Sequence, residues 1–275
     1  MAKISAFIIA KNEETRIAKA IESVKNIVEE LYVIDSGSID RTVEIAGQLG
    51  AKVIYNPWPG YVKQKAFGES LCKNDWILNI DADEELSLRL QNEIKAIFAA
   101  GNQDQYLAYQ IKLVIMMPLD IKPRFLAPYN KCIRLYHRGS ASFANNKDST
   151  THDSVLFNKD VDFAGKIYQL KASALHRSAT SIEQLIAKAN FYTTQQAQDL
   201  INTSRLPSKL RTSLELFFWI FKAFFLRRYF VFGFDGFVYS IIFAFARFTR
   251  LAKAREKAHP RVGICHPRGG GDPEL

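Results

Sequence analysis

Cysteine is scarce in this chain of 275 residues, and its three copies, Cys72, Cys132 and Cys265, lie far apart. No CxxC pair occurs, so the sequence predicts neither a zinc knuckle nor a disulfide framework and favours a reducing compartment. Glycine-rich phosphate loops of the GxGxxG and GxxxxGK[ST] kinds are absent as well. If the protein binds phosphate, we therefore expect it to use a metal ion or basic side chains.

The sequence also lacks a long uninterrupted apolar run. The N-terminal run 4–10 is short and charged residues follow at once, which excludes an export signal. Near the other end, 214–226 is shorter than the roughly 20 apolar residues that a membrane span needs, and 229–246 is interrupted by an aspartate and glycines. We predict no span and a cytoplasmic protein.

Excess charge is confined to one part of the chain. Residues 1–203 carry 24 basic and 23 acidic side chains, whereas residues 204–275 carry 13 basic and 5 acidic ones. This distribution indicates a nearly neutral domain followed by a basic, aromatic region, and not a nucleic-acid-binding surface throughout.

The first hundred residues alternate strand and helix patterns. Ile17, Ala20, Ile21 and Val24, for example, are spaced as on one face of a helix. Repeated strand–helix units predict an α/β fold with a Rossmann-type, mostly parallel sheet flanked by helices. The expected strands are 4–10, 31–34, 53–55 and 76–80, and the expected helices are 17–24, 40–49, 62–72 and 90–98.

Beyond residue 105 the pattern changes. Residues 106–116 and 131–137 are typical of strands without intervening helices, and Gly139 favours a hairpin, so this half is expected to be a mixed sheet. Ser181 and Gln184 form a capping box that opens a later helix. We divide the chain into a catalytic domain (1–203), a helical, basic and aromatic region (204–258) and a disordered tail (259–275).

Three polar clusters follow predicted strands: KNEE (11–14), DSGSIDRT (35–42) and DADEE (81–85). Ligands of open parallel sheets bind at the carboxyl ends of strands, where such clusters meet. Asp81 and Asp83 suit a divalent cation, Mg²⁺ or Mn²⁺, that keeps water and phosphate oxygens as its other ligands. The alternative is that these acids only open the helix near Ser87, and the other two clusters could equally be a capped loop and a turn.

Four segments in this order resemble the nucleotide-sugar-binding half of glycosyltransferase family 2: FIIAKNEE, ELYVIDSGSIDRT, YVKQKAFGES and NDWILNIDADEEL. The lipopolysaccharide-core beta-glucosyltransferase branch is the most similar. The resemblance is strong over residues 3–100 and continues more loosely, through segments such as LHRSATSIEQLIAKANFYT and FGFDG, to about residue 250.

This resemblance implies a GT-A fold, a nucleoside-diphosphate sugar donor, most simply UDP-glucose, and inversion at the anomeric carbon. It also implies a role for each matching residue, although this chain has Ala66 where relatives often have asparagine. Ala10, Asn12 and Glu13 would line the nucleotide pocket, Asp35 would contact the base, Lys65 would lie near the nucleotide, Asp81 would approach the ribose or metal, and Asp83 would ligate the metal.

An inverting displacement needs one general base on the acceptor hydroxyl. The resemblance assigns this role to Asp153, with His152 as a supporting residue that orients the aspartate or touches the metal. The alternative is that both lie in a surface loop, with Glu84 and Glu85 as reserve candidates. His176 is expected to be a structural histidine.

The function these observations favour is transfer of a hexose to a lipopolysaccharide or lipooligosaccharide core at the inner face of the cytoplasmic membrane. The same chemistry could serve another cell-envelope glycan or lipid-linked acceptor. A haloacid-dehalogenase-type phosphatase would leave KNEE and DSGSIDRT unexplained, and a basic module binding membrane or nucleic acid would leave the acidic clusters unexplained. The C-terminal helices either close the domain or meet anionic lipid through Arg227, Arg228, Arg247, Arg250, Lys253 and Arg255.

Overall fold

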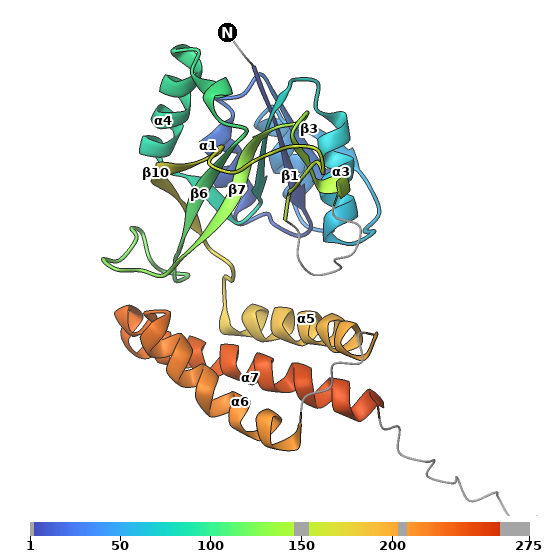
Figure 1. Cartoon of the computed structure of the whole chain (residues 1–275), viewed down its shortest axis with the longest axis vertical. Helices are drawn as coiled ribbons and strands as arrows, with labels where there is room; N and C mark the ends of the chain where they lie inside the picture. Colours follow the sequence, from blue (N-terminus) through green and yellow to red (C-terminus); the bar gives the residue numbers. More distant parts are fainter. Residues whose placement is uncertain (1–2, 146–153, 203–207, 259–275) are drawn as a thin grey trace, which may run out of the picture.

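The computed structural model describes residues 3–145, 154–202 and 208–258. Strands and helices alternate at first, then strands follow one another, and helices end the chain (Figure 1). The elements are β1 (Ile4–Ala10), α1 (Ile17–Val24), β2 (Glu30–Asp35), α2 (Thr42–Gln48), β3 (Lys52–Tyr55), α3 (Tyr61–Leu71), β4 (Trp76–Asp81), β5 (Glu84–Leu86), α4 (Leu88–Ala99), β6 (Ala108–Ile115), β7 (Tyr129–His137), β8 (Ala141–Ser142), β9 (Leu156–Phe157), β10 (Ile167–His176), α5 (Ile182–Asn202), α6 (Lys209–Phe221) and α7 (Gly233–Ala258).

One eight-stranded sheet organises the molecule, in the order β3-β2-β1-β4-β7-β6-β10-β5. The first four strands are parallel. Beyond them β7 runs antiparallel to β4 and β6, β10 is parallel to β6, and β5 is antiparallel to β10. The predicted fold class is confirmed, including the mixed second half and the helical C-terminal region.

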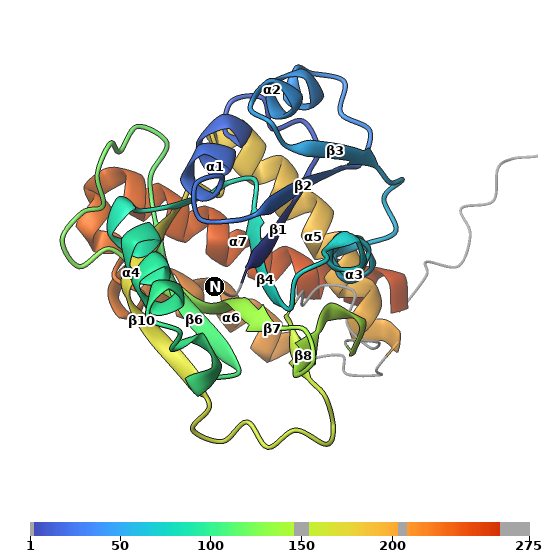
Figure 2. The ribbon, with the colours of Figure 1, turned by 90° about the horizontal axis from the view of Figure 1, so that it is seen from above.

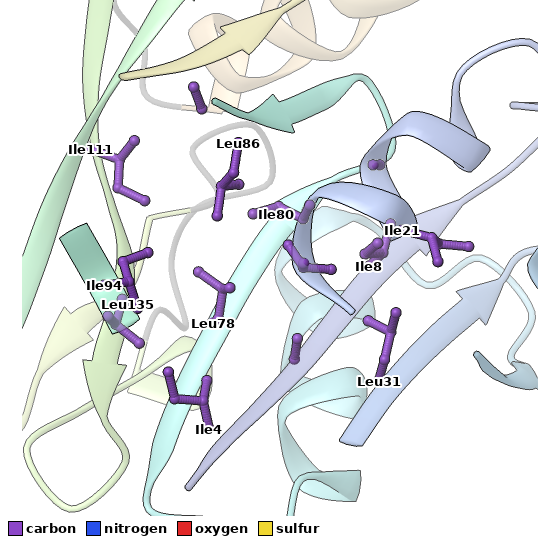
Figure 3. Close-up of a cluster of buried hydrophobic side chains, with 14 of the residues drawn as sticks. Ile4, Ile8, Ile21, Leu31, Leu78, Ile80, Leu86, Ile94, Ile111 and Leu135 are labelled. Atoms are coloured by element: carbon purple, nitrogen blue, oxygen red, sulfur yellow. The ribbon is translucent and has the colours of Figure 1, made fainter. Parts of the chain in front are cut away.

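Both faces of the central strands are buried, which explains their continuous apolar sequences. In β1, Ile4 and Ile8 pack on one face with the helices α1 and α4, while Phe7 packs on the other. Figure 3 shows the first of these clusters, where Ile21 of α1 and Ile94 of α4 approach the sheet. The side chains predicted to form the inner face of α1 are all fully buried.

Helix α3 covers the opposite face at unusually short range. A Cβ atom at Gly68 would lie 2.6 Å from the ring of Phe7, so a glycine is required where this helix crosses β1. The close approach also brings Lys65, one turn earlier in α3, to the end of β4. Packing of an apolar face thereby positions a charged side chain at the edge of the sheet.

The predicted hairpin at Gly139 is wrong. The chain leaves the main sheet after β7, and β8 pairs with β9 in a separate two-stranded sheet. Glu69 of α3 explains this course, because its carboxylate accepts hydrogen bonds from the Ser142 hydroxyl (2.6 Å) and the Phe143 amide (3.1 Å). Phe143 is then buried against the α3 face of the sheet.

Helices α5, α6 and α7 form a layer beneath the edge toward which β1 runs (Figures 1 and 2). Within the described ranges, 229–258 is the one helical stretch long and apolar enough to cross a membrane, although no span was predicted. The glycines that interrupt the apolar run do not end the helix: Gly233, with φ of 60°, marks the start of α7, and Gly236 lies inside it.

The sequence left open whether the basic residues of α7 meet lipid or help to close the domain, and two of them contact neighbouring helices. Lys253 donates hydrogen bonds to the Thr194 hydroxyl (2.8 Å) and the Asn190 side chain (2.7 Å) of α5, and Arg250 lies 3.8 Å from Glu215 of α6. These contacts favour a helix that lies on the domain over one that crosses a bilayer. The tail 259–275 and the domain boundary at 203–204 lie outside the described residues.

Candidate nucleotide and metal site at the carboxyl edge

The three predicted clusters meet at one edge of the sheet, because strands β1, β2 and β4 are adjacent and parallel. Ala10 at the end of β1 is in register with Asp35 at the end of β2, and Ile9 is in register with Asp81 at the end of β4. Residues from three separate segments therefore share one edge, as the sequence predicted.

Asp35 shapes the loop that follows it. Its carboxylate accepts hydrogen bonds from the Gly37 amide (2.9 Å) and the Ser38 hydroxyl (2.5 Å), and the side chain is buried. Gly37 has φ of 89°, a conformation that glycine adopts without strain. The contact with a nucleotide base remains a prediction.

Asn12 and Glu13 tie the first loop to the second. Asn12, itself in the left-handed region with φ of 55°, accepts a hydrogen bond from the Ile39 amide (2.9 Å) through its side chain. The Glu13 amide donates to the Thr42 hydroxyl (2.7 Å), and the Glu13 carboxylate accepts from Arg16 (2.7 Å). Burial raises the pKa of Glu13 despite this cation. The two loops consequently hold each other in place.

Gln64 is a residue that the sequence analysis missed. It is fully buried in α3, donates to the Ser36 hydroxyl (3.0 Å) and accepts from the Asn56 side chain (2.7 Å). It thereby joins the DSGS loop to the turn after β3. The sequence signal that could have identified Gln64 as a site residue is its position inside the YVKQKAFGES segment.

Asp81 is held between two cations. Its carboxylate oxygens lie 2.8 Å from Lys65 and 2.7 Å from Arg134, a β7 residue that the sequence analysis missed. Burial raises the pKa of Asp81, but the charges of Arg134 and Lys65 outweigh burial and hold it well below its ordinary value. Asp81 is therefore ionised and already paired, and the proximity of Lys65 to a nucleotide remains a prediction.

Glu84 and Glu85, the reserve candidates for the general base, also form ion pairs. Glu84 is 2% exposed and pairs with Arg134, and burial raises its pKa although that arginine opposes the shift. Glu85 lies 2.9 Å from Arg177. Both belong to the short edge strand β5, where no strand was expected. Their pairing makes them poor candidates for a base that must reach a substrate.

Asp83 occupies the turn between β4 and β5 and faces three elements. Its Oδ2 atom lies 3.5 Å from Nε2 of His176 at the end of β10 and 3.9 Å from both Lys188 of α5 and Arg16. Burial raises the pKa of Asp83, but the hydrogen bond with His176 and the charges of His176 and Lys188 together outweigh burial, and the net pKa is lowered. The structure thus brings together Asp83 and a histidine that the sequence analysis set aside as structural.

The donor set of this corner fits a divalent cation. Carboxylate oxygen and imidazole nitrogen are ligands for Mn²⁺, and Nε2 of His176 is the nitrogen that faces the Asp83 carboxylate. The described residues contain no group of three or more potential ligands, so two protein ligands would leave positions for water and phosphate. His152 and Asp153 lie outside the described residues.

A mostly parallel sheet continued by a mixed half, with an Asp-x-Asp motif at its carboxyl edge, defines a GT-A-type glycosyltransferase. The model of the glycosyl transferase family 2 matches residues 5–158, more than half of the sequence, and the chain belongs to this family.

Relatives agree with this membership. A Rickettsia felis protein described as an uncharacterized glycosyltransferase is 68% identical over 93% of this chain and 90% of its own length. The lipopolysaccharide core biosynthesis glycosyltransferase LpsC of Rhizobium meliloti is 26% identical over 94% of this chain and 96% of its own. A solved glucosyl-3-phosphoglycerate synthase from Mycobacterium tuberculosis, bound to Mn²⁺, UDP and its product, covers 67% of this chain and 75% of its own at 17% identity and a TM-score of 0.43, too distant to assign substrates here.

Proposed function

We propose that this glycosyltransferase moves a hexose, glucose from UDP-glucose, with inversion onto a lipopolysaccharide or lipooligosaccharide core acceptor, assisted by Mg²⁺ or Mn²⁺. The main observation behind the proposed donor site is the contact between Asp83 and His176, which lie 93 positions apart in the sequence. Similarity to LpsC along nearly the whole of both chains supports the acceptor class.

Asp83 and His176 would hold the metal, and Asp81, already paired with Lys65 and Arg134, would approach the metal or the ribose without being a third ligand. When bound, such an ion neutralises the negative charge that develops on a departing diphosphate. The protein's own contribution is to fix Asp83 in the turn between β4 and β5 and His176 at the end of β10, and to place Lys188 3.9 Å from Asp83. A lysine there would attract the diphosphate.

The nucleotide would lie across the loops after β1 and β2. Ala10, Asn12, Glu13 and Asp35 form this part of the edge, and Lys65 reaches it from α3 beside Asp81. Because these loops are fixed by hydrogen bonds to each other, they would present a preformed surface to the donor.

The acceptor hydroxyl would be deprotonated by Asp153, with His152 orienting it. This assignment is supported by the family resemblance and by the pairing of the two reserve candidates, Glu84 and Glu85, with arginines. A single base on the face opposite the leaving group satisfies an inverting displacement.

We place the protein in the cytoplasm, peripheral on the inner face of the membrane. Helix α6 exposes a stripe of large apolar side chains, and α7 exposes another; ring contact between Trp219 and Phe243 (5.6 Å) links these helices. We call the exposed residues the aromatic stripe: Leu210, Leu214, Phe217, Phe218 and Phe221 on α6, and Phe234, Phe237, Ile241 and Phe245 on α7. Such surfaces dip into the headgroup region, where a lipid-linked acceptor resides.

Calorimetric titration with UDP, with and without Mn²⁺, tests the donor site. Asp83→Ala should abolish metal-dependent binding while leaving the protein folded. Asp75→Ala is the matched control, because Asp75 is an exposed aspartate just before the other end of β4. Metal-dependent binding that persists in Asp83→Ala, or that disappears equally in Asp75→Ala, would refute the assignment.

A further inference from the structure

A cavity of about 570 Å³ lies between the sheet and the helical layer. Its walls come from the ends of β6, β7 and β10 on one side and from α5, α7 and the segment between α6 and α7 on the other. His176 and Lys188 form one part of the wall, so the cavity adjoins the corner occupied by Asp83. The volume is typical of sites for small ligands.

The wall of this cavity is strongly cationic. Four of the residues around it are basic, namely Lys188, Arg227, Arg228 and Arg247, and none of the described residues that line it is an aspartate or glutamate. The nearby Asp81 corner is different, because there Lys65 and Arg134 are matched by carboxylates. Clustered like charges without acids disfavour the unliganded state and favour binding of an anion.

Arg247 shows this imbalance most clearly. Its guanidinium stacks 4.2 Å from the Trp219 ring, and its Nε has no hydrogen-bond partner in the part of the chain that the structure describes. Burial, and then the neighbouring charge of Arg250, lower the pKa of Arg247. Glu215 is the nearby acid, but it already accepts a hydrogen bond from Trp219 (2.9 Å) and lies 3.8 Å from Arg250.

Other polar atoms of the wall also lack partners. The Tyr239 hydroxyl and Nδ1 of His176 are buried without hydrogen bonds to described residues, although buried polar groups are normally satisfied. Arg228 adopts the left-handed conformation with φ of 62°, which is uncommon for a residue with a side chain and recurs at binding sites. Tyrosines and amides complete a wall suited to sugar hydroxyls: Tyr129, Asn130, Tyr192, Gln196 and Tyr229.

We propose that this cavity binds the acceptor and that the acceptor is an anionic saccharide, whose phosphate or carboxylate group pairs with Arg228 and Arg247. Its hydroxyls would contact Tyr239 and neighbouring polar groups. The inference rests on the proposed sugar transfer, because the cavity adjoins the proposed donor corner. A charged saccharide would thus be selected over a neutral one by α7 and the segment between α6 and α7, not by the nucleotide-binding half.

Ligand-observed NMR titration with four probes tests this: glucose 6-phosphate, glucuronate, glucose and inorganic phosphate. Each is titrated with the donor site empty and with UDP and Mn²⁺ present. We expect both anionic sugars to bind at least about tenfold more tightly than glucose, since charge-assisted hydrogen bonds are the strong ones. Their relative affinities distinguish phosphate from carboxylate, and the inorganic phosphate arm shows whether the sugar ring contributes.

Three variants locate the binding. Arg228→Gln and Arg247→Gln should each weaken the anionic probes about tenfold, and Tyr239→Phe should weaken them less while keeping the ring. Lys257→Gln is the control, an exposed cation on the same helix away from the cavity, and should change nothing. Melting temperatures establish that the variants fold, and Tyr239→Phe still provides a test if Arg247→Gln does not.

Equal affinity for glucose and the charged sugars, binding unchanged in all three variants, or failure of every anionic probe to bind would overturn the proposal. Displacement of the anionic sugars by UDP would do the same, because it would place them in the donor site. Loss of UDP binding alone is a different failure: it refutes the proposed donor site while leaving the cavity's preference measurable.

Discussion

The parallel half, strands β1 to β4 with their helices, differs from the helical layer in how its charged groups are paired. Several acids of the parallel half accept hydrogen bonds from the protein itself, whereas several arginines of the helical layer surround a cavity. In the parallel half, Glu30, Asp35 and Asp40 each accept hydrogen bonds from backbone amides close by. In the helical layer, Arg227, Arg228 and Arg247 surround a cavity without described acids, and large apolar side chains face outward.

This difference separates residues that build the site from residues that remain available to ligands. Polar residues at the edge of a sheet often form hydrogen bonds that fix the conformation of their own loops. Most residues of KNEE and DSGSIDRT have this role here. What remains for a ligand is Asp83 with His176 at the carboxyl edge, and Arg227, Arg228 and Arg247, which line a cavity without described acids. The comparison therefore predicts chemistry at the boundary between the two regions.

The largest effect is expected at the proposed base. Asp153→Asn should lower kcat by about 10² to 10⁴, the usual contribution of a positioned general base, while UDP affinity stays nearly unchanged. Steady-state transfer and UDP titration measure the two quantities, with the exposed Asp160→Asn as control. If UDP binding were lost instead, Asp153 would belong to the donor site, and its assignment as the base for the acceptor would be wrong.

A smaller effect is expected on the outer face of the helical layer. Replacing Phe217 and Phe221 of the aromatic stripe by serine should reduce binding to anionic vesicles about tenfold or more, because each ring buries a large apolar area. Vesicle sedimentation measures this. Leu88→Ser, at an equally exposed site on α4, should have no effect. Equal loss in both would mean that the stripe has no special role.

The smallest effect is expected on stability, and it tests how much the hydrogen bonds of an acidic side chain in the parallel half contribute to folding. Glu30 accepts hydrogen bonds from the Ser5 hydroxyl (2.5 Å) and the Lys73 amide (2.6 Å). Burial raises the pKa of Glu30, but these hydrogen bonds outweigh it and the folded pKa lies below the ordinary 4.5. The stabilisation is therefore complete above pH 4.5 and is lost as pH falls through the folded pKa.

Glu30→Gln should lower the free energy of unfolding by about 1 kcal/mol at pH 7 and make little difference at strongly acidic pH. Denaturant titrations across this range measure it. The exposed Glu29→Gln should cost only a few tenths of that. A cost for Glu30→Gln that is independent of pH would show that ionisation is not what stabilises this contact.

Local patterns in the sequence predicted the elements well. The 3.6-residue spacing of α1 identified its buried face, and the Ser181 hydroxyl does accept from the Gln184 amide (3.1 Å) at the start of α5. Each of these depends on residues only a few positions apart, which a pattern records directly.

Long-range pairing explains what the sequence analysis missed. Strand β5 exists because Glu84–Leu86 pairs with β10, almost 90 residues later, and no local periodicity shows this. The same pairing carries His176 to Asp83. From composition alone it stayed open whether the basic residues of α7 meet lipid or close the domain, whereas in the structure Lys253 and Arg250 face α5 and α6. A charge count does not tell which side of a helix carries the charge.

The most direct test of the account is whether an imidazole nitrogen coordinates the metal at this corner. Electron spin-echo spectroscopy of Mn²⁺ bound with UDP detects a directly coordinated nitrogen. We predict this signal in the wild-type protein and in His137→Ala, a histidine at the opposite end of the sheet, and its loss in His176→Ala. A nitrogen signal that persists in His176→Ala, or wild-type Mn²⁺ bound with UDP but without any nitrogen ligand, would contradict the account.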